Sequence, residues 1–317
     1  MRAGARSGGG GAAAWAAGLG VALLLAAAPG CRRGATLPPF DEARAFRDLE
    51  AQVAFGPRVP GSEAHRRCRE FLAAALAEAG GRVAVAAAPD TAFPIPGVDT
   101  LYNVSARFGP AAGPHLVLGA HWDSRPRADR DPDPERRGEA VPGANDGASG
   151  VAVLLEVARV LGRHAPPMGV EIVLFDGEDA GHEGDPASYA RGSQAYVARL
   201  APPLPLHAVV VDMVGRRGLR LYQEVNSHDA AANLVDRLWA GARRVGAAAF
   251  VPELRHNVYD DHIPFIQAGI PAVDLIDLDD PDWHTTRDLP ANCDPASLGQ
   301  VGRVLLWHVY TLETGGP

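Results

Sequence analysis

The chain has 317 residues, enough for one large domain or two small ones. Hydrophobic residues make up 47% and charged residues 21%, which is ordinary for a globular protein with a sizeable core. The formal net charge is −8 and no basic block stands out, so the composition argues against a nucleic-acid partner.

Residues 1–34 are predicted to be an export leader, separate from the fold. Arg2 and Arg6 precede the apolar run "AAAWAAGLGVALLLAAA", and Cys31 follows it. A positive start, a short apolar middle and small residues before a cleavage point are typical of a secretory signal. Because Cys31 is placed as in bacterial lipoproteins, we expect a periplasmic, secreted or lipid-anchored protein. An uncleaved membrane anchor is the alternative.

Residues 35–317 are predicted to form a single domain in which helices and strands alternate. Strand–helix–strand alternation favours an α/β fold with a largely parallel sheet covered on both faces. In chain order, apolar periodicity and turn residues predict helices at 40–56 and 63–81 (capped by Ser62), a strand at 115–121, a helix at 147–164, strands at 171–177 and 207–215, a helix at 227–246, a strand at 271–278 and a helix at 297–313.

Acidic and imidazole side chains follow the predicted strands at their carboxyl ends, where parallel α/β sheets bind ligands. Three carboxylates fall within residues 176–179, and they repel one another unless a cation is near or one of them is protonated. The set comprises His121, Asp123, Asp146, Asp176, Glu178, Asp179, Asp212, Trp283 and His284.

Carboxylate oxygens combined with neutral imidazole favour a divalent cation, most often zinc where the site is catalytic. The candidate ligands are Asp146, one of Glu178 and Asp179, and His284. The other acid of the adjacent pair would transfer a proton. Taken singly, each residue also has an ordinary interpretation, such as a helix cap or a turn. The histidines at 115, 164, 182, 207 and 308 are interpreted as structural or exposed.

Two cysteines, Cys68 and Cys293, follow the leader. In an oxidising compartment they can form one disulfide, and we expect this bond after export. Two separate buried thiols are the alternative.

Six segments occur in the order seen in glutaminyl-peptide cyclotransferases, which share their fold with zinc-dependent bacterial aminopeptidases. The resemblance extends over residues 40–313 and implies a three-layer αβα fold with a mostly parallel mixed sheet, of the zinc exopeptidase type. The segments are "GAHWDSRP", "GANDGASGVAVLLEVAR", "VLFDGEDA", "VVVDMVG", "DDHIPFIQAGIPAVDLI" and "WHTTRD".

The resemblance implies an enzyme that converts N-terminal glutamine to pyroglutamate with release of ammonia, acting on the N-termini of peptides or proteins. One zinc ion would be held by Asp146, Asp179 and His284. The remaining roles are implied residue by residue: Glu178 as general acid/base, Asp212 and Asp260 as acids in its hydrogen-bond network, and Trp283 and Gln194 as substrate-binding residues.

The second activity of the superfamily, a zinc aminopeptidase that hydrolyses N-terminal residues from peptides, is the alternative. A second zinc would then be held by His121, Asp146 and Asp212, and Glu178 would activate water. The chain also departs from the cyclase pattern. Asp179 stands where cyclases have a second glutamate, and Gly184 stands where eukaryotic cyclases have a tryptophan.

Two hypotheses from other classes of protein are also compatible with the acidic and imidazole residues described above. One is a noncatalytic binding protein on the same fold, and the other is a surface-anchored lipoprotein whose metal only stabilises it. Metal removal separates the classes, because a structural ion supports folding whereas a catalytic ion supports turnover. The protein is expected to be a monomer.

Overall fold

The computed structural model describes residues 37–312 of the chain and the isolated positions 1, 4, 8, 10 and 11. The chain divides into two units, residues 1–36 and 37–317. Cys31 and most of the predicted leader lie outside the described residues, so export and lipidation stay predictions. Within the described part, no helix is both long and apolar enough to cross a membrane.

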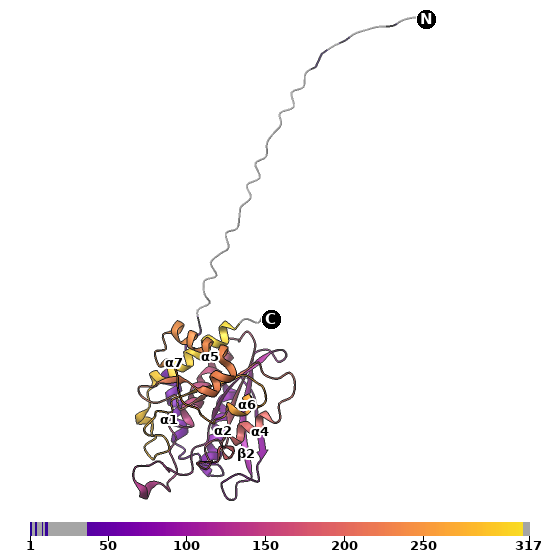
Figure 1. The fold of residues 1–317 in the computed structure, drawn as a ribbon. Coiled ribbons are helices and arrows are strands. Elements are labelled where there is room, and N and C mark those ends of the chain that lie inside the picture. Colours follow the sequence, from indigo (N-terminus) through magenta and orange to yellow (C-terminus); the bar gives the residue numbers. More distant parts are fainter. Residues whose placement is uncertain (2–3, 5–7, 9, 12–36, 313–317) are drawn as a thin grey trace. The chain divides into compact units, whose positions relative to one another are not determined.

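Figure 1 shows the helices and strands of the second unit. Its main sheet has six strands in the order β1-β2-β4-β3-β5-β8. β3, β4, β5 and β8 are parallel, whereas β2 is antiparallel to both β1 and β4. This confirms the mostly parallel mixed sheet. The strands are β1 Arg82–Pro89, β2 Thr100–Phe108, β3 His115–His121, β4 Gly169–Phe175, β5 Ala208–Asp212 and β8 Ala272–Ile276, and a smaller sheet pairs β6 Leu221–Gln223 with β7 Phe250–Leu254.

The four parallel strands are mostly apolar because both of their faces are covered. Each is buried along its whole length. Successive side chains of a strand point to opposite faces, so on β3 Leu116 and Leu118 enter the larger core and Val117 enters the smaller one. Continuous apolar runs are what such doubly covered strands require.

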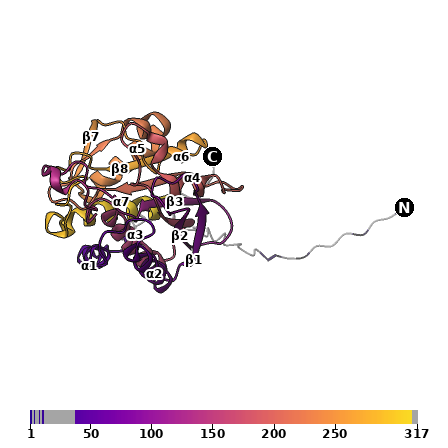
Figure 2. The ribbon, with the colours of Figure 1, turned by 90° about the horizontal axis from the view of Figure 1, so that it is seen from below.

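Helices on both sides of the sheet complete three layers (Figure 2). α1, α2, α3, α5 and α7 contribute to the larger core, and α4 and α6 pack around Phe175 and Phe265 in the smaller one. Ser62 caps α2 as predicted, because its Oγ accepts the N–H of His65 at 3.1 Å. The helices are α1 Glu42–Val53, α2 Glu63–Glu78, α3 Ala148–Arg163, α4 Arg191–Val197, α5 Val225–Val245, α6 Ile263–Gln267 and α7 Pro295–Thr311, with 3₁₀ turns η1 Pro134–Arg136, η2 Pro186–Ser188 and η3 Pro290–Asn292.

The predicted disulfide is wrong, because Cys68 and Cys293 are both free and buried. Cys68 lies on α2, which packs against β1, β2 and α3. Cys293 follows η3 and pairs through its backbone with Arg216, beyond β5. Burial raises the pKa of the Cys68 thiol to about 12 and raises the pKa of Cys293 as well. The two cysteines are therefore separate buried thiols.

Candidate metal centre and active site

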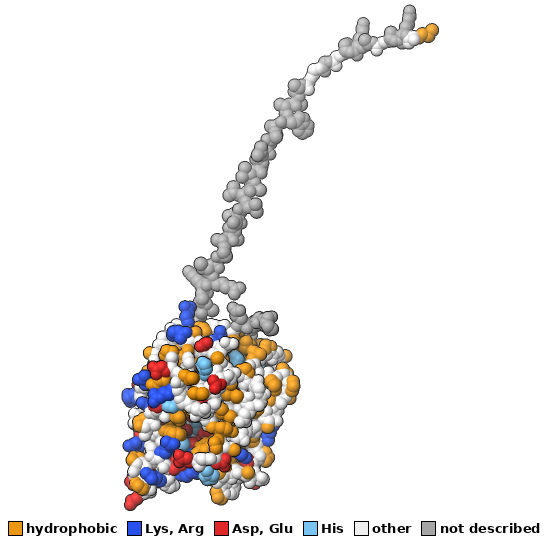
Figure 3. Space-filling view, viewed as in Figure 1, with side chains coloured by type: hydrophobic (Ala, Val, Ile, Leu, Met, Phe, Trp, Pro, Cys, Tyr) orange, Lys and Arg blue, Asp and Glu red, His pale blue; other side chains and the backbone are white. Residues whose placement is uncertain are grey.

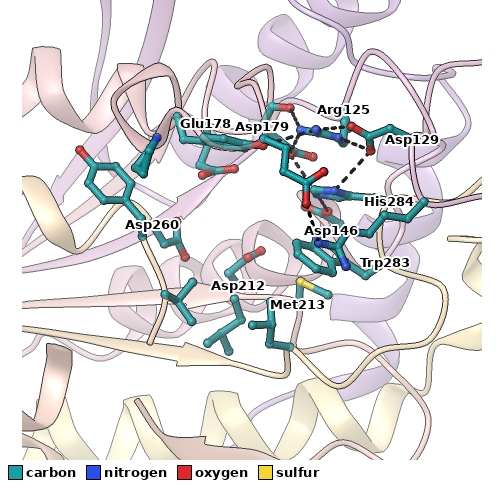
Figure 4. A pocket seen from close by; sticks show the side chains of 18 of the residues that line it. Arg125, Asp129, Asp146, Glu178, Asp179, Asp212, Met213, Asp260, Trp283 and His284 are labelled. Atoms are coloured by element: carbon teal, nitrogen blue, oxygen red, sulfur yellow. Dashed lines mark hydrogen bonds and ion pairs between the residues drawn. The ribbon is translucent and has the colours of Figure 1, made fainter. Parts of the chain in front are cut away.

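Separate segments of the chain line a cavity of about 280 Å³ beyond the carboxyl ends of the parallel strands. Figure 3 shows acidic side chains in a hollow of the surface, bordered by hydrophobic ones. This is the position at which parallel α/β sheets bind ligands. The acidic and imidazole residues that line it include Asp146 before α3, Glu178 and Asp179 after β4, Asp212 at the end of β5, and His284 after β8 (Figure 4).

The tight turn after β4 places Glu178 and Asp179 together. Gly177 has φ +69°, and a Cβ at this position would lie 2.8 Å from the side chain of Leu101. Glycine adopts this conformation without steric cost. The next two backbone N–H groups donate to the carboxylate of Asp123, at 3.1 Å from Glu178 and 3.3 Å from Asp179. The backbone that follows Gly177 is therefore held in place.

Asp146 and His284 are also held by their surroundings. The carboxylate of Asp288 accepts the N–H groups of Asn145 at 2.7 Å and Asp146 at 3.0 Å. Burial raises the pKa of Asp288 to about 8. His284 has φ +57°, a conformation that is rare for residues other than glycine. Strained backbone of this kind concentrates at functional sites.

Asp146, Asp179 and His284 form a set that fits a metal ion, since one ligand atom from each lies within 4.8 Å of the others. His284 Nε2 lies 3.2 Å from Asp179 Oδ1 and 3.6 Å from Asp146 Oδ2. Both Asp146 Oδ2 and Asp179 Oδ2 are buried without a hydrogen-bond partner. Burying unpaired carboxylate oxygens is costly, and a cation between them removes that cost.

A second set of potential ligands, His121, Asp146 and Asp212, shares Asp146 with the first. His121 Nε2 lies 3.2 Å from Asp146 Oδ1 and 3.0 Å from Asp212 Oδ1. His121 is almost fully buried, as are the residues of the first set. Asp146 and Asp212 line the cavity, whereas His121 lies behind them. Burial opposes protonation of His121, but the charge of Asp212 and hydrogen bonds to neighbouring carboxylates raise its pKa well above the usual value.

Glu178 and Asp260 line the same cavity and are nearly fully buried. Burial, followed by the charge of Asp260, raises the pKa of Glu178 well above its ordinary value. Burial and the charge of Asp212 raise the pKa of Asp260 to about 6. A carboxyl group that exchanges its proton near neutral pH is suited to general acid/base chemistry.

Trp283 lines the cavity, whereas the structure does not bring Gln194 there. The guanidinium carbon of Arg130 lies 4.1 Å from the centre of a Trp283 ring and stacks over it. The side-chain amide of Gln194 instead donates to the backbone oxygens of Tyr189 at 2.8 Å and of Ala187 at 3.4 Å. Gln194 therefore supports the loop that carries Tyr189, which does line the cavity.

A third buried group, which the sequence does not reveal, combines His262 and Asp274 with Asp260. His262 Nε2 lies 3.3 Å from Glu224 Oε2, and both carboxylate oxygens of Asp274 lack a hydrogen-bond partner. His262 follows two aspartates in "DDHIPF", a motif that was given a role only for Asp260. Also missed were Arg125, Asp129 and Asp288, which contact the candidate ligands or hold their backbone.

Residues 103–309 match the model of peptidase family M28. The glutaminyl-peptide cyclotransferase-like protein of Mus musculus is 29% identical over 279 residues, covering 78% of this chain and 70% of that protein.

Two solved structures are also similar. The glutaminyl cyclase of Tannerella forsythia is 37% identical, with a TM-score of 0.82 over 87% of this chain and 100% of that chain. A Zn-dependent exopeptidase of Parabacteroides distasonis is 34% identical, with a TM-score of 0.83 over 87% of this chain and 100% of that chain.

Proposed function

The chain belongs to peptidase family M28, and from this premise we propose that it is a zinc-dependent glutaminyl-peptide cyclotransferase. Such an enzyme converts an N-terminal glutamine of a peptide or protein into pyroglutamate and releases ammonia. The similarity to a solved glutaminyl cyclase and to a curated cyclotransferase-like protein supports this activity, and the similarity to a Zn-dependent exopeptidase supports the metal.

The observation that carries the proposal is the position of Glu178. This buried carboxyl group lies at the cavity beside the candidate ligand Asp179, and its pKa is raised. In ring closure the α-amine nitrogen forms a bond to the γ-carboxamide carbon, and the bond from that carbon to its own nitrogen breaks. Glu178 accepts the proton that the amine loses and returns it to the leaving nitrogen, which departs as ammonia.

Asp146, Asp179 and His284 would hold the zinc ion at the cavity wall. When bound, zinc supplies a Lewis acid that polarises the γ-carboxamide. The chain itself supplies the shape of the pocket, in which Trp283, Tyr259 and Ile276 form apolar walls. A closed pocket orients the amine and the carboxamide of one substrate toward each other, and this orientation lowers the barrier to ring closure.

An aminopeptidase with two zinc ions is the second candidate, because His121, Asp146 and Asp212 also form a ligand set. The second set is as compact as the first, since His121 Nε2 lies 3.2 Å from Asp146 Oδ1 and 3.0 Å from Asp212 Oδ1, so the number of bound zinc ions separates the two candidates. Ring closure needs no water, whereas a hydrolase must deliver water to the peptide carbonyl.

Incubation with a glutaminyl dipeptide tests the proposal directly. We expect the mass of the peptide to fall by the loss of ammonia, with no release of free glutamine. Release of glutamine would instead identify the aminopeptidase, and an unchanged peptide in the presence of zinc would contradict both activities.

A further inference from the structure

Arg125 is a fully buried arginine that contacts a candidate metal ligand from behind. Its side chain is 1% exposed. Nη1 donates to Asp179 Oδ1 at 3.0 Å and to the backbone oxygen of Asp179 at 2.9 Å. These two bonds involve Oδ1 and the backbone oxygen of Asp179, while Asp179 Oδ2 is buried and has no hydrogen-bond partner.

The other edge of the same guanidinium binds Asp129. Nε donates to Asp129 Oδ1 at 2.9 Å, and Nη2 donates to Asp129 Oδ2 at 2.6 Å. Arginine is always charged and its donors form a rigid planar fork, so one guanidinium can fix two carboxylates relative to each other. Because Asp129 neutralises Arg125, the pair adds little net charge near the metal site.

Asp129 reaches a second candidate ligand, His284. Its Oδ1 lies 3.6 Å from His284 Nδ1, while the opposite ring nitrogen, Nε2, lies 3.2 Å from Asp179 Oδ1 (Figure 4). Metal-binding histidines commonly donate their second ring N–H to a carboxylate, which fixes the tautomer and the orientation of the ring. At 3.6 Å the Asp129 carboxylate is beyond hydrogen-bond distance, but it is the carboxylate that faces Nδ1 of the His284 ring.

We propose that Arg125 and Asp129 form a bridge that positions two of the three zinc ligands, Asp179 and His284, and thereby sets the affinity for the metal. The bridge runs from Asp179 through Arg125 and Asp129 to His284, so the two ligands, which are more than 100 residues apart in the sequence, are held as one unit. The inference rests on the metal site of the proposed function but does not depend on which reaction that site catalyses.

Competition with a chromogenic chelator for zinc tests the bridge. Loss of such supporting contacts typically weakens metal affinity 10–100-fold. We expect a loss of this size for Asp129→Ala and for Arg125→Lys, which keeps the charge but cannot hold two carboxylates. Because both variants break one bridge, the double variant should lose little more than the weaker-binding single variant. The absorption spectrum of the cobalt-substituted protein should change in each variant.

Arg127→Lys is the matched control. Arg127 Nε lies 3.4 Å from the same Asp129 carboxylate, but none of the polar contacts found for Arg127 is to a candidate ligand. Its zinc affinity should stay within about twofold of the original protein. The Asp129 side chain is 32% exposed, so its replacement should disturb the fold less than a change at the buried Arg125. The bridge is refuted if the Asp129→Ala variant binds zinc as tightly as the control. If the original protein shows no cyclase activity but zinc affinity still falls in these variants, the proposed reaction is refuted and the bridge is supported.

Discussion

Glu178 and Asp179 are neighbours in the sequence, yet the structure shifts the pKa values of their carboxyl groups in opposite directions. Burial raises the pKa of both groups. For Glu178 the charge of Asp260 adds to burial, and its pKa lies well above the ordinary value. For Asp179 the charges of His284 and Arg125 outweigh burial and lower the pKa to about 2. Two titratable groups driven apart in this way are suited to separate roles, one as proton carrier and one as metal ligand.

Replacement of Glu178 tests this division of roles. Glu178→Gln keeps the size of the side chain and removes its ability to carry a proton. We expect the cyclisation rate to fall by at least ~10²-fold, a typical general acid/base contribution, while zinc content and melting temperature stay unchanged. Glu183→Gln, at an exposed acid that also lines the cavity, is the control and should retain activity. Full activity of Glu178→Gln would remove Glu178 from the mechanism.

At the scale of helices and strands, the sequence predicts those elements whose position is determined by a local pattern of residues. The four parallel strands are recognisable because their full burial favours mostly apolar runs, and β3 begins and ends at the residues expected. The antiparallel strands were not recognised. β1 is largely exposed at the sheet edge and consists mostly of alanine and valine, so it carries no clear alternation.

Contacts between distant elements were beyond the reach of the sequence. The candidate ligands were identified from their positions after strands, because parallel strands bring their carboxyl ends to one edge. Which buried side chains support the ligands depends on packing, so the sequence does not reveal the roles of Arg125 and Asp129, although Arg125 belongs to the segment "GAHWDSRP". The same limit explains the wrong disulfide, since two cysteines do not reveal which elements bring their sulfur atoms together.

The β4 turn gives a prediction at this scale. Gly177→Ala introduces a side chain where φ is positive and where its Cβ would lie 2.8 Å from Leu101. We expect a loss of stability of at least about 1 kcal/mol, together with weaker zinc binding because Asp179 shifts. Gly218→Ala is the control, since φ is also positive there but no atom lies within 4 Å of the added Cβ. Equal zinc affinity in both variants would show that the turn does not position Asp179.

At the scale of the whole molecule, a histidine pair joins the sheet to the outer helices. Arg237 on α5 donates to His308 Nδ1 at 3.2 Å, so the proton of His308 lies on Nε2 and is donated to His207 Nε2 at 2.8 Å. Burial, with the charge of Arg237, lowers the pKa of His207 to about 4, and it lowers the pKa of His308 well below its ordinary value. The pair is therefore neutral in the folded protein at neutral pH.

This pair predicts how stability depends on pH. Between about pH 4 and 6.5 the unfolded chain binds protons at these histidines and the folded chain does not, so the free energy of unfolding falls as the pH is lowered through that range. The contribution is fully present above pH 6.5. Urea unfolding at pH 5 and pH 7 measures it. His207→Asn should reduce the difference between the two pH values, whereas the exposed His164→Asn should not. An unchanged difference in His207→Asn would rule out the pair as its source.

Removal of the metal tests whether the fold depends on it. The two largest apolar cores lie on either side of the sheet and are made of residues other than the ligands, so most of the folding free energy should survive without the ion. We expect the chelated protein to unfold cooperatively at a moderately lower temperature, because it loses only the stabilisation that the bound ion provides.

Cyclisation should be abolished by removal of the metal and should return when about one zinc per chain is restored, since a catalytic site of this kind holds one ion with three protein ligands. Two tightly held zinc ions would favour the aminopeptidase. Collapse of the fold on chelation would favour a lipoprotein in which the ion is structural.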